Sequence, residues 1–262
     1  MTIPAPDIYQ FALLHHESLE FPHSHERSLR LFKESVVHPS LRSLSSAIDA
    51  NSRDEDPTAV FLVDDLANLF QATVESYLLA VQSMWERGLR DLLITREERL
   101  RTGIKKADLQ RANWSAKSDS LQMRFEQLIG LPMTAFDSYA DLDFLQHLGN
   151  AVRHGDGSSA EKIHSLSPSL WFNWLAPGEV IHACLYPIVV PKDAPKHPSF
   201  NEVTVEQRLL EQMIQSVTNF WLDLEYIRCN SFRSKSVSTI QHLEKWVAER
   251  SARQTNRFWN PC

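Results

Sequence analysis

The stretch AVFLVDDLANLFQATVESYLLAVQSMWERGLRDLLITREER, residues 59–99, decides the fold class of this chain. No proline lies between Pro57 and Pro132, so no residue here removes a backbone donor from a helix. Apolar side chains recur with the period of an amphipathic helix: Leu62, Leu66, Leu69, Tyr77, Val81 and Met84. A second set keeps the same phase on another face: Glu75, Leu78, Gln82, Glu86, Leu89 and Leu93. We predict one long helix packed on two sides within a bundle, and any kink in it would fall near Gly88.

Further helices are expected on both sides of this one. Periodicity and stop signals place them at residues 25–36, 118–129, 138–154, 209–221 and 238–250. Ser118 and Ser120 are candidate caps for the helix at 118–129, and Ser138 with Asp141 is a candidate capping box for the helix at 138–154. Thr204 and Gln207 form a similar box before the helix at 209–221. Residues 52–57 indicate an acidic loop.

The fold class predicted from these elements is mainly α, a helical bundle with a C-terminal helical elaboration. Residues 177–198 are β-branched and aromatic but contain Pro187, so they allow at most a short β-hairpin. We divide the chain into an N-terminal helical and irregular segment (1–57), a helical core (58–176) and a C-terminal helical extension (177–262) that packs on the core.

Composition excludes several classes of protein. A hydrophobic share of 43% and a charged share of 23% in 262 residues are typical of a globular chain. The net charge of −6 means that nucleic acid would need a local basic patch, for which residues 87–111 are the best place. The same charges are also typical of a solvated helix end. No apolar run approaches the roughly 18 residues of a membrane helix.

The cysteines and the N-terminus indicate a cytoplasmic protein. Cys184, Cys229 and Cys262 are odd in number and widely spaced, which argues against a disulfide framework or a thiolate metal cluster. The first twenty residues lack the basic start, apolar stretch and small-residue cleavage site of a secretory signal. Histidines cluster near this end, at positions 15, 16, 23 and 25. An exposed tail is favoured over a metal site for them.

The segment DLDFLQHLGNAVRHGDGSSAEKIHSLSPSLW, residues 141–171, is the richest in chemistry. On a helix its apolar residues face the core, while a narrow polar stripe forms on another edge from Asp143, His147, Asn150 and His154. His154 falls in the last turn before Gly155, and imidazole both accepts and gives protons near neutral pH. Arg153 would neutralise phosphate charge, although it points about 100° away on an ideal helix. Periodicity alone favours a solvated helix face.

The run Asn150-Ala-Val-Arg153-His154-Gly155, preceded by the helical MWERGLRDLL at residues 84–93, resembles the signature of the HEPN superfamily. The resemblance covers about residues 59–171. It implies a helical bundle, and many members are metal-independent endoribonucleases of toxin–antitoxin, phage-defence or RNA-processing systems. Members commonly dimerise so that two such helices build one composite cleft. Their motif is an Arg, then Asn or another polar residue, and a His four to six residues beyond the Arg.

By this resemblance His154 takes the catalytic histidine position and Asn150 the polar position. The expected Arg is missing, because residue 149 is glycine. Either Arg153 or His147 replaces it, or the domain keeps its scaffold without cleavage. In the active case the ribose 2′-hydroxyl attacks the adjacent phosphate while His154 assists proton transfer. Asn150 and Arg153 then steady the phosphate.

Glu86 on the long helix is a candidate supporting carboxylate, and Asp143 and His147 complete the candidate site. No metal is expected at this stripe, because His147 and His154 are about 10 Å apart along the helix. No cofactor is expected, because the sequence has no phosphate-binding glycine loop and no dinucleotide fingerprint. The predicted partners are RNA and a second copy of the chain. The alternative is a non-catalytic adaptor that binds a protein, such as an antitoxin or a larger defence effector. Gly149 favours this alternative.

Overall fold

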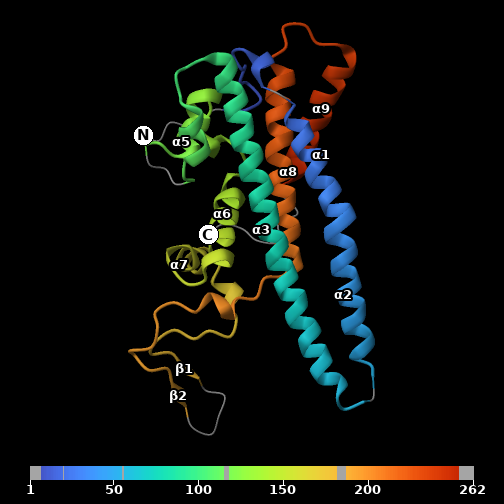
Figure 1. Cartoon of the computed structure of the whole chain (residues 1–262), viewed down its shortest axis with the longest axis vertical. Helices are drawn as coiled ribbons and strands as arrows, with labels where there is room; N and C mark the ends of the chain where they lie inside the picture. Colours follow the sequence, from blue (N-terminus) through green and yellow to red (C-terminus); the bar gives the residue numbers. More distant parts are fainter. Residues whose placement is uncertain (1–6, 20, 55, 115–117, 182–186, 254–262) are drawn as a thin grey trace.

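The computed structural model describes residues 7–19, 21–54, 56–114, 118–181 and 187–253. One helix, α3 (Ala59–Leu100), runs through most of the molecule; with 42 residues it is about 63 Å long. Its neighbours include α1 (Pro22–Phe32), α2 (His38–Asn51) and α8 (Gln207–Asn230), with α6 (Tyr139–His154) on another side (Figure 1). The long helix packed on two sides is therefore confirmed, and so is the mainly α fold.

Gly88 allows neighbouring side chains to approach α3 closely. A Cβ at this position would lie 2.8 Å from His25 Nδ1 and 3.1 Å from the Trp221 ring. The His25 and Trp221 rings themselves stack with centroids 4.3 Å apart. The helix is continuous through Gly88. The glycine therefore makes room for α1 and α8 at this point.

The remaining helices are shorter. They are α4 (Lys106–Arg111), α5 (Leu121–Ile129), α7 (Ser158–Leu166) and α9 (Val237–Ala252), with 3-10 turns at His16–Ser18, Met133–Ala135, Pro168–Trp171 and Phe200–Glu202. The strands β1 (Val180–Ile181) and β2 (Ile188–Val189) pair antiparallel, so a short hairpin does form there. Among the described helices, none is long and apolar enough to span a membrane.

Two helix predictions need correction. The helix expected at 25–36 does not stop there, because a π-helical turn, Lys33–Val37, joins α1 directly to α2. This wider turn lies just before Pro39, the residue without an amide hydrogen, so the chain stays helical past it. Helix α7 was not predicted at all. It begins at Ser158, directly after Gly155 and Gly157. In the sequence these glycines indicate the end of the preceding helix and give no sign that a new one begins.

The capping predictions are right at one place and wrong at two. Ser120 caps α5 by accepting a hydrogen bond from the Met123 amide at 3.2 Å. Ser138 makes no such bond, and Asp141 is buried against α8, where it accepts from Ser216 Oγ at 2.6 Å. Helix α8 begins after Glu206 without a side-chain cap, so the box at Thr204 and Gln207 is also absent.

A single hydrophobic core joins the three sequence segments. Its largest fully buried side chains include Trp85, Phe125, Phe144, Phe220 and Trp221, while Leu29 and Leu41 come from the N-terminal segment. Cys229 also lies in this core, where burial raises the pKa of its thiol to about 12. Cys184 and Cys262 lie outside the described residues.

The N-terminal segment packs on the body, which corrects the expectation of an exposed tail. Ile8, Leu13 and Leu19 are buried. Buried Arg96 ties this segment to α5, because its guanidinium donates to the carbonyl oxygens of Leu14 at 3.1 Å and Leu128 at 2.5 Å. Burial lowers the pKa of Arg96 to about 10. The described residues contain no cluster of three or more His, Cys, Asp or Glu that could hold a metal ion.

Helix α2 and the first part of α3 form a hairpin, residues 38–73, that projects from the body (Figure 1). Leu41 is the buried residue of α2, and α3 buries its first side chain only at Val74. Val63, Leu66 and Phe70 recur at heptad spacing on α3 and are half-buried. Large apolar side chains remain exposed on this α2–α3 hairpin: Val60, Phe61, Leu62 and Leu69.

Candidate functional site

Helix α6 carries the polar stripe predicted from the sequence. It ends at Gly155, which has a φ of 71° and whose backbone N–H donates a hydrogen bond to the Ala151 carbonyl oxygen, so the helix stops directly after His154. The face opposite solvent buries Phe144, Leu145 and Leu148 in the core. This burial fixes the rotation of α6, and the stripe therefore lies at the edge of the bundle.

A network of polar side chains joins α6 to α3; we call Gln82, Glu86, Arg90, Gln146 and Arg153 the α3–α6 polar network. Gln82 is fully buried, and its Nε2 donates to Glu86 Oε2 at 2.6 Å and to Gln146 Oε1 at 3.0 Å. Gln146 Nε2 donates to the same Glu86 oxygen at 3.2 Å. Arg153 donates to Gln82 Oε1 at 2.5 Å. The orientation of the Gln82 amide is therefore fixed on both sides.

Arg90 compensates the charge of Glu86. Its guanidinium forms a hydrogen-bonded ion pair with Glu86 Oε1 and also donates to the carbonyl oxygens of Leu109 at 2.9 Å and Gln110 at 3.1 Å. Glu86 thus accepts hydrogen bonds from an arginine and two glutamines. In this arrangement the carboxylate holds Gln82 in place, and Gln82 in turn holds Arg153.

Gly149 packs directly against Gln82 of α3 within this network. A Cβ at residue 149 would stand 3.0 Å from Gln82 Cγ and 3.1 Å from Gln82 Oε1. A side chain at this position would therefore require Gln82 to shift by a few tenths of an ångström. Arg153, one turn later, reaches the same Gln82 amide. The structure thus brings a cation to the neighbourhood of residue 149 from the next turn of the helix.

Gly149→Ala is expected to lower the free energy of unfolding by about 1–2 kcal/mol, as overpacked core positions do. Alanine is intrinsically the better helix former by about 1 kcal/mol, but a shift of Gln82 to make room would strain its hydrogen bonds to Glu86, Gln146 and Arg153. Urea unfolding followed by circular dichroism measures the change. The double variant Gln82→Ala, Gly149→Ala should lose less free energy of unfolding than the sum of the losses in the two single variants. A more stable Gly149→Ala protein would contradict the close packing.

Asn150 and His154 are the two members of the stripe that stay open. Asn150 is half-buried and His154 is exposed. Within the described part of the chain, neither side chain makes a hydrogen bond. An imidazole and an amide one turn apart at a helix end are therefore free to contact a bound molecule.

Asp143 and His147, in contrast, contact neighbouring elements. Asp143 Oδ1 accepts a hydrogen bond from Trp114 Nε1 at 2.8 Å. His147 Nδ1 lies 3.4 Å from Ser159 Oγ on α7. Burial lowers the pKa of His147, Asp143 opposes that change, and Lys162 adds to it. His147 is therefore placed to remain neutral at neutral pH. Its partner is Ser159, whereas Arg153 is the residue of α6 that donates to the Gln82 amide oxygen, so His147 does not replace the missing arginine there.

The predicted basic region at residues 87–111 is smaller than its sequence suggests. Arg96 is buried, and Arg90 is committed to Glu86 and two carbonyl oxygens. Arg87 remains exposed on α3, on the turn that also carries Glu86 and Arg90. Exposed cations on or beside α6 include Arg153, which contacts Gln82, and Lys162 of α7, which acts on His147.

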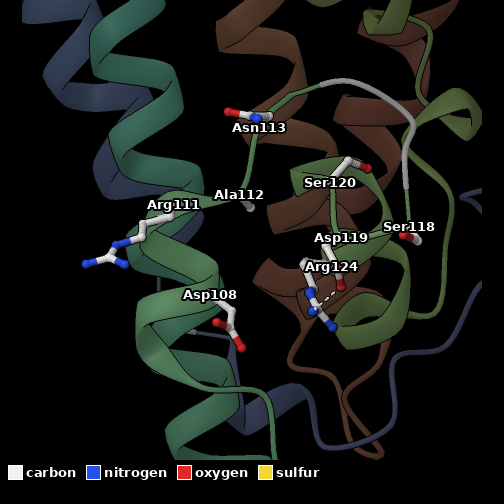
Figure 2. Close-up of a pocket in the computed structure, with 8 residues that line it drawn as sticks. All are labelled: Asp108, Arg111, Ala112, Asn113, Ser118, Asp119, Ser120 and Arg124. Carbon is white, nitrogen blue, oxygen red and sulfur yellow. Dashed lines mark hydrogen bonds and ion pairs between the residues drawn. The ribbon is translucent and has the colours of Figure 1, made fainter.

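A separate pocket of about 460 Å³ lies between α4 and α5 (Figure 2). Its lining mixes both charges with hydroxyl and amide groups: Asp108, Arg111, Ala112, Asn113, Ser118, Asp119, Ser120 and Arg124. Arg124 pairs with Asp119 at 2.6 Å, and Figure 2 shows the Arg111 side chain directed away from the other labelled residues. Sequence reasoning missed this pocket, because its residues carry no motif.

No family model, curated protein or solved structure matches this chain. The resemblance to the HEPN superfamily therefore rests on the residues of α3 and α6 quoted above.

Proposed function

We propose that the chain is a HEPN-like, metal-independent endoribonuclease that acts as a homodimer. The observation that carries this proposal is the pairing of an open His154 with an Arg153 held by Gln82 beside Gly149. This arrangement supplies a proton-transfer group and a cation on adjacent residues. We further propose a cytoplasmic toxin or phage-defence effector as the setting.

In this mechanism the ribose 2′-hydroxyl attacks the adjacent phosphorus. A neutral imidazole takes the hydroxyl proton, a 2′,3′-cyclic phosphate forms, and the bond to the 5′ oxygen breaks. The leaving oxygen takes a proton from an imidazolium. A composite cleft between two α6 helices would provide two His154 rings, one as base and one as acid. Arg153 would stabilise the charge that develops on the phosphate, with Asn150 as a further donor.

Glu86 has a positioning role in this proposal. Its carboxylate is already compensated by Arg90, so it is poorly suited to take the substrate proton. It accepts from Gln82, whose oxygen accepts from Arg153. The chain of hydrogen bonds from Glu86 through Gln82 sets the position of the Arg153 guanidinium.

Purified protein incubated with total RNA in the presence of EDTA is expected to produce fragments with 2′,3′-cyclic phosphate and 5′-hydroxyl ends. Arg153→Ala should lower the rate by about 10²–10³-fold, the usual loss when one charge-stabilising donor is removed. Arg153→Lys should recover part of it, because a lysine retains the charge but not the geometry. A folded wild-type protein that leaves all RNA intact would overturn the proposal.

A non-catalytic adaptor is the second candidate, and two observations favour it. The close packing of Gly149 on Gln82 disfavours the arginine of the usual motif at this position. The α2–α3 hairpin also exposes apolar side chains at Phe61 and Leu69, in a stretch with six acidic residues against Arg42 and Arg53. A protein partner with a basic, apolar segment would complement this surface. Intact RNA with a correctly folded chain would favour this role.

A further inference from the structure

Two histidines from separate elements meet at the last turn of α7. His164 lies in the last turn of α7, and His197 lies in the loop before the 3-10 turn Phe200–Glu202. Their Nδ1 atoms are 3.5 Å apart, their ring centroids 5.7 Å apart, and their planes nearly perpendicular at 83°. His164 is half-buried and His197 is exposed, so the space between the two nitrogens is reached from solvent.

The two nitrogens lie at the long limit of a hydrogen bond, and their separation also matches that of two ligands of one ion. Hydrogen bonds from N–H groups have typical donor–acceptor distances of about 2.9–3.0 Å. Two imidazole nitrogens that bind one tetrahedral Zn²⁺ at about 2.1 Å are about 3.4 Å apart. We infer that His164 and His197 form a binding site for a divalent transition-metal ion of the Zn²⁺ or Cu²⁺ class, with water completing the coordination.

The site is held in place before any ion binds. Trp171 Nε1 donates to the Ser199 carbonyl oxygen at 2.8 Å, two residues after His197. The Asp156 carboxylate accepts from the Phe200 amide at 2.6 Å and from Ser199 Oγ at 3.2 Å. These bonds fix the loop against the start of α7, so little ordering of the loop is needed on binding.

The aromatic surroundings suit neutral imidazole ligands. The His164 ring meets Trp174 edge-on with centroids 4.8 Å apart, and Trp171 at 5.4 Å. Burial lowers the pKa of His164, and the neighbouring His197 lowers it further. A neutral ring is the form that binds metal. The described residues add no third His, Cys, Asp or Glu, which leaves the remaining positions of the ion to water.

The test is titration of the metal-free full chain with ZnCl₂ and CuCl₂, followed by calorimetry and by tryptophan fluorescence. We expect one ion per chain, tighter binding of Cu²⁺ than of Zn²⁺, and quenching by Cu²⁺ because two tryptophans contact His164. His164→Gln and His197→Gln should each weaken binding at least about tenfold. Lowering the pH to about 5 should release the ion, because protonated imidazole does not coordinate.

His242→Gln is the matched control. His242 also lies near a tryptophan, Trp246, with ring centroids 6.0 Å apart, but it has no histidine partner among the described residues. The His242→Gln substitution should leave the affinity for Zn²⁺ and Cu²⁺, and the quenching of tryptophan fluorescence by Cu²⁺, unchanged. Binding that survives both His164→Gln and His197→Gln, or no binding to the correctly folded wild-type chain, would overturn the assignment. Because the proposed cleavage uses no metal, either outcome leaves the RNA assay unaffected.

Discussion

His154→Ala is expected to lower the rate of RNA cleavage by about 10²–10⁴-fold, the contribution that a general acid or base makes. The His154 ring stands at the end of α6, is exposed, and makes no hydrogen bond to the described residues. Its removal therefore deletes the proton-transfer group without breaking a contact of the fold. The free energy of unfolding should change by no more than about 0.5 kcal/mol.

The rate is measured on a short labelled RNA under single-turnover conditions, with EDTA present. His242→Ala serves as the control, because it removes an exposed imidazole from α9, far along the chain from α6. Its rate should equal that of the wild-type protein. Undiminished cleavage by His154→Ala would remove the histidine from the mechanism, whatever the activity of the other variants.

Trp85→Ala is expected to lower the free energy of unfolding by about 3–5 kcal/mol, the usual cost of deleting a buried large aromatic side chain. Trp85 is fully buried on α3, at the point where the long helix meets elements on two sides. Its ring packs edge-on against Trp114 at 4.9 Å and against Phe220 of α8 at 6.2 Å. Alanine would leave a cavity between these rings.

Urea unfolding monitored by far-ultraviolet circular dichroism measures this loss. Trp85→Phe should cost much less, because it keeps a ring and deletes an indole N–H that has no partner among the described residues. Trp246→Ala, at a half-buried position on α9, is the control and should cost about 1 kcal/mol. Equal losses for Trp85→Ala and Trp246→Ala would show that α3 is not the centre of the core.

Periodicity was enough to predict α3, because a helix packed on two sides repeats its apolar residues over many turns. It was not enough for features that depend on partners distant in sequence. Asp141 has the spacing of a capping box with Ser138, yet its carboxylate is buried against Ser216 of α8. Local sequence does not reveal that competing partner. Helix α7 is short and follows two glycines, so its own pattern was too weak to predict it.

The candidate site was predictable as a set of residues but not as an arrangement. The sequence placed Asn150 and His154 on one edge of a helix, and the structure leaves both open there. Gln82 was expected on the second packed face of the long helix, but nothing in the sequence gave it or Gln146 a role in the site, because glutamines at helical spacing resemble any polar position. Only the crossing of α3 and α6 shows that Gly149 meets Gln82, and that Arg153 reaches the amide from the next turn.

The unbroken course of α3 has a mechanical consequence. The exposed Phe61 on the α2–α3 hairpin and the buried Gln82 of the α3–α6 polar network belong to one helix, about 32 Å apart along its axis. No loop or glycine interrupts α3 between them. A partner that displaced the α2–α3 hairpin would therefore act on the same helix that carries the Gln82 amide bound to Arg153.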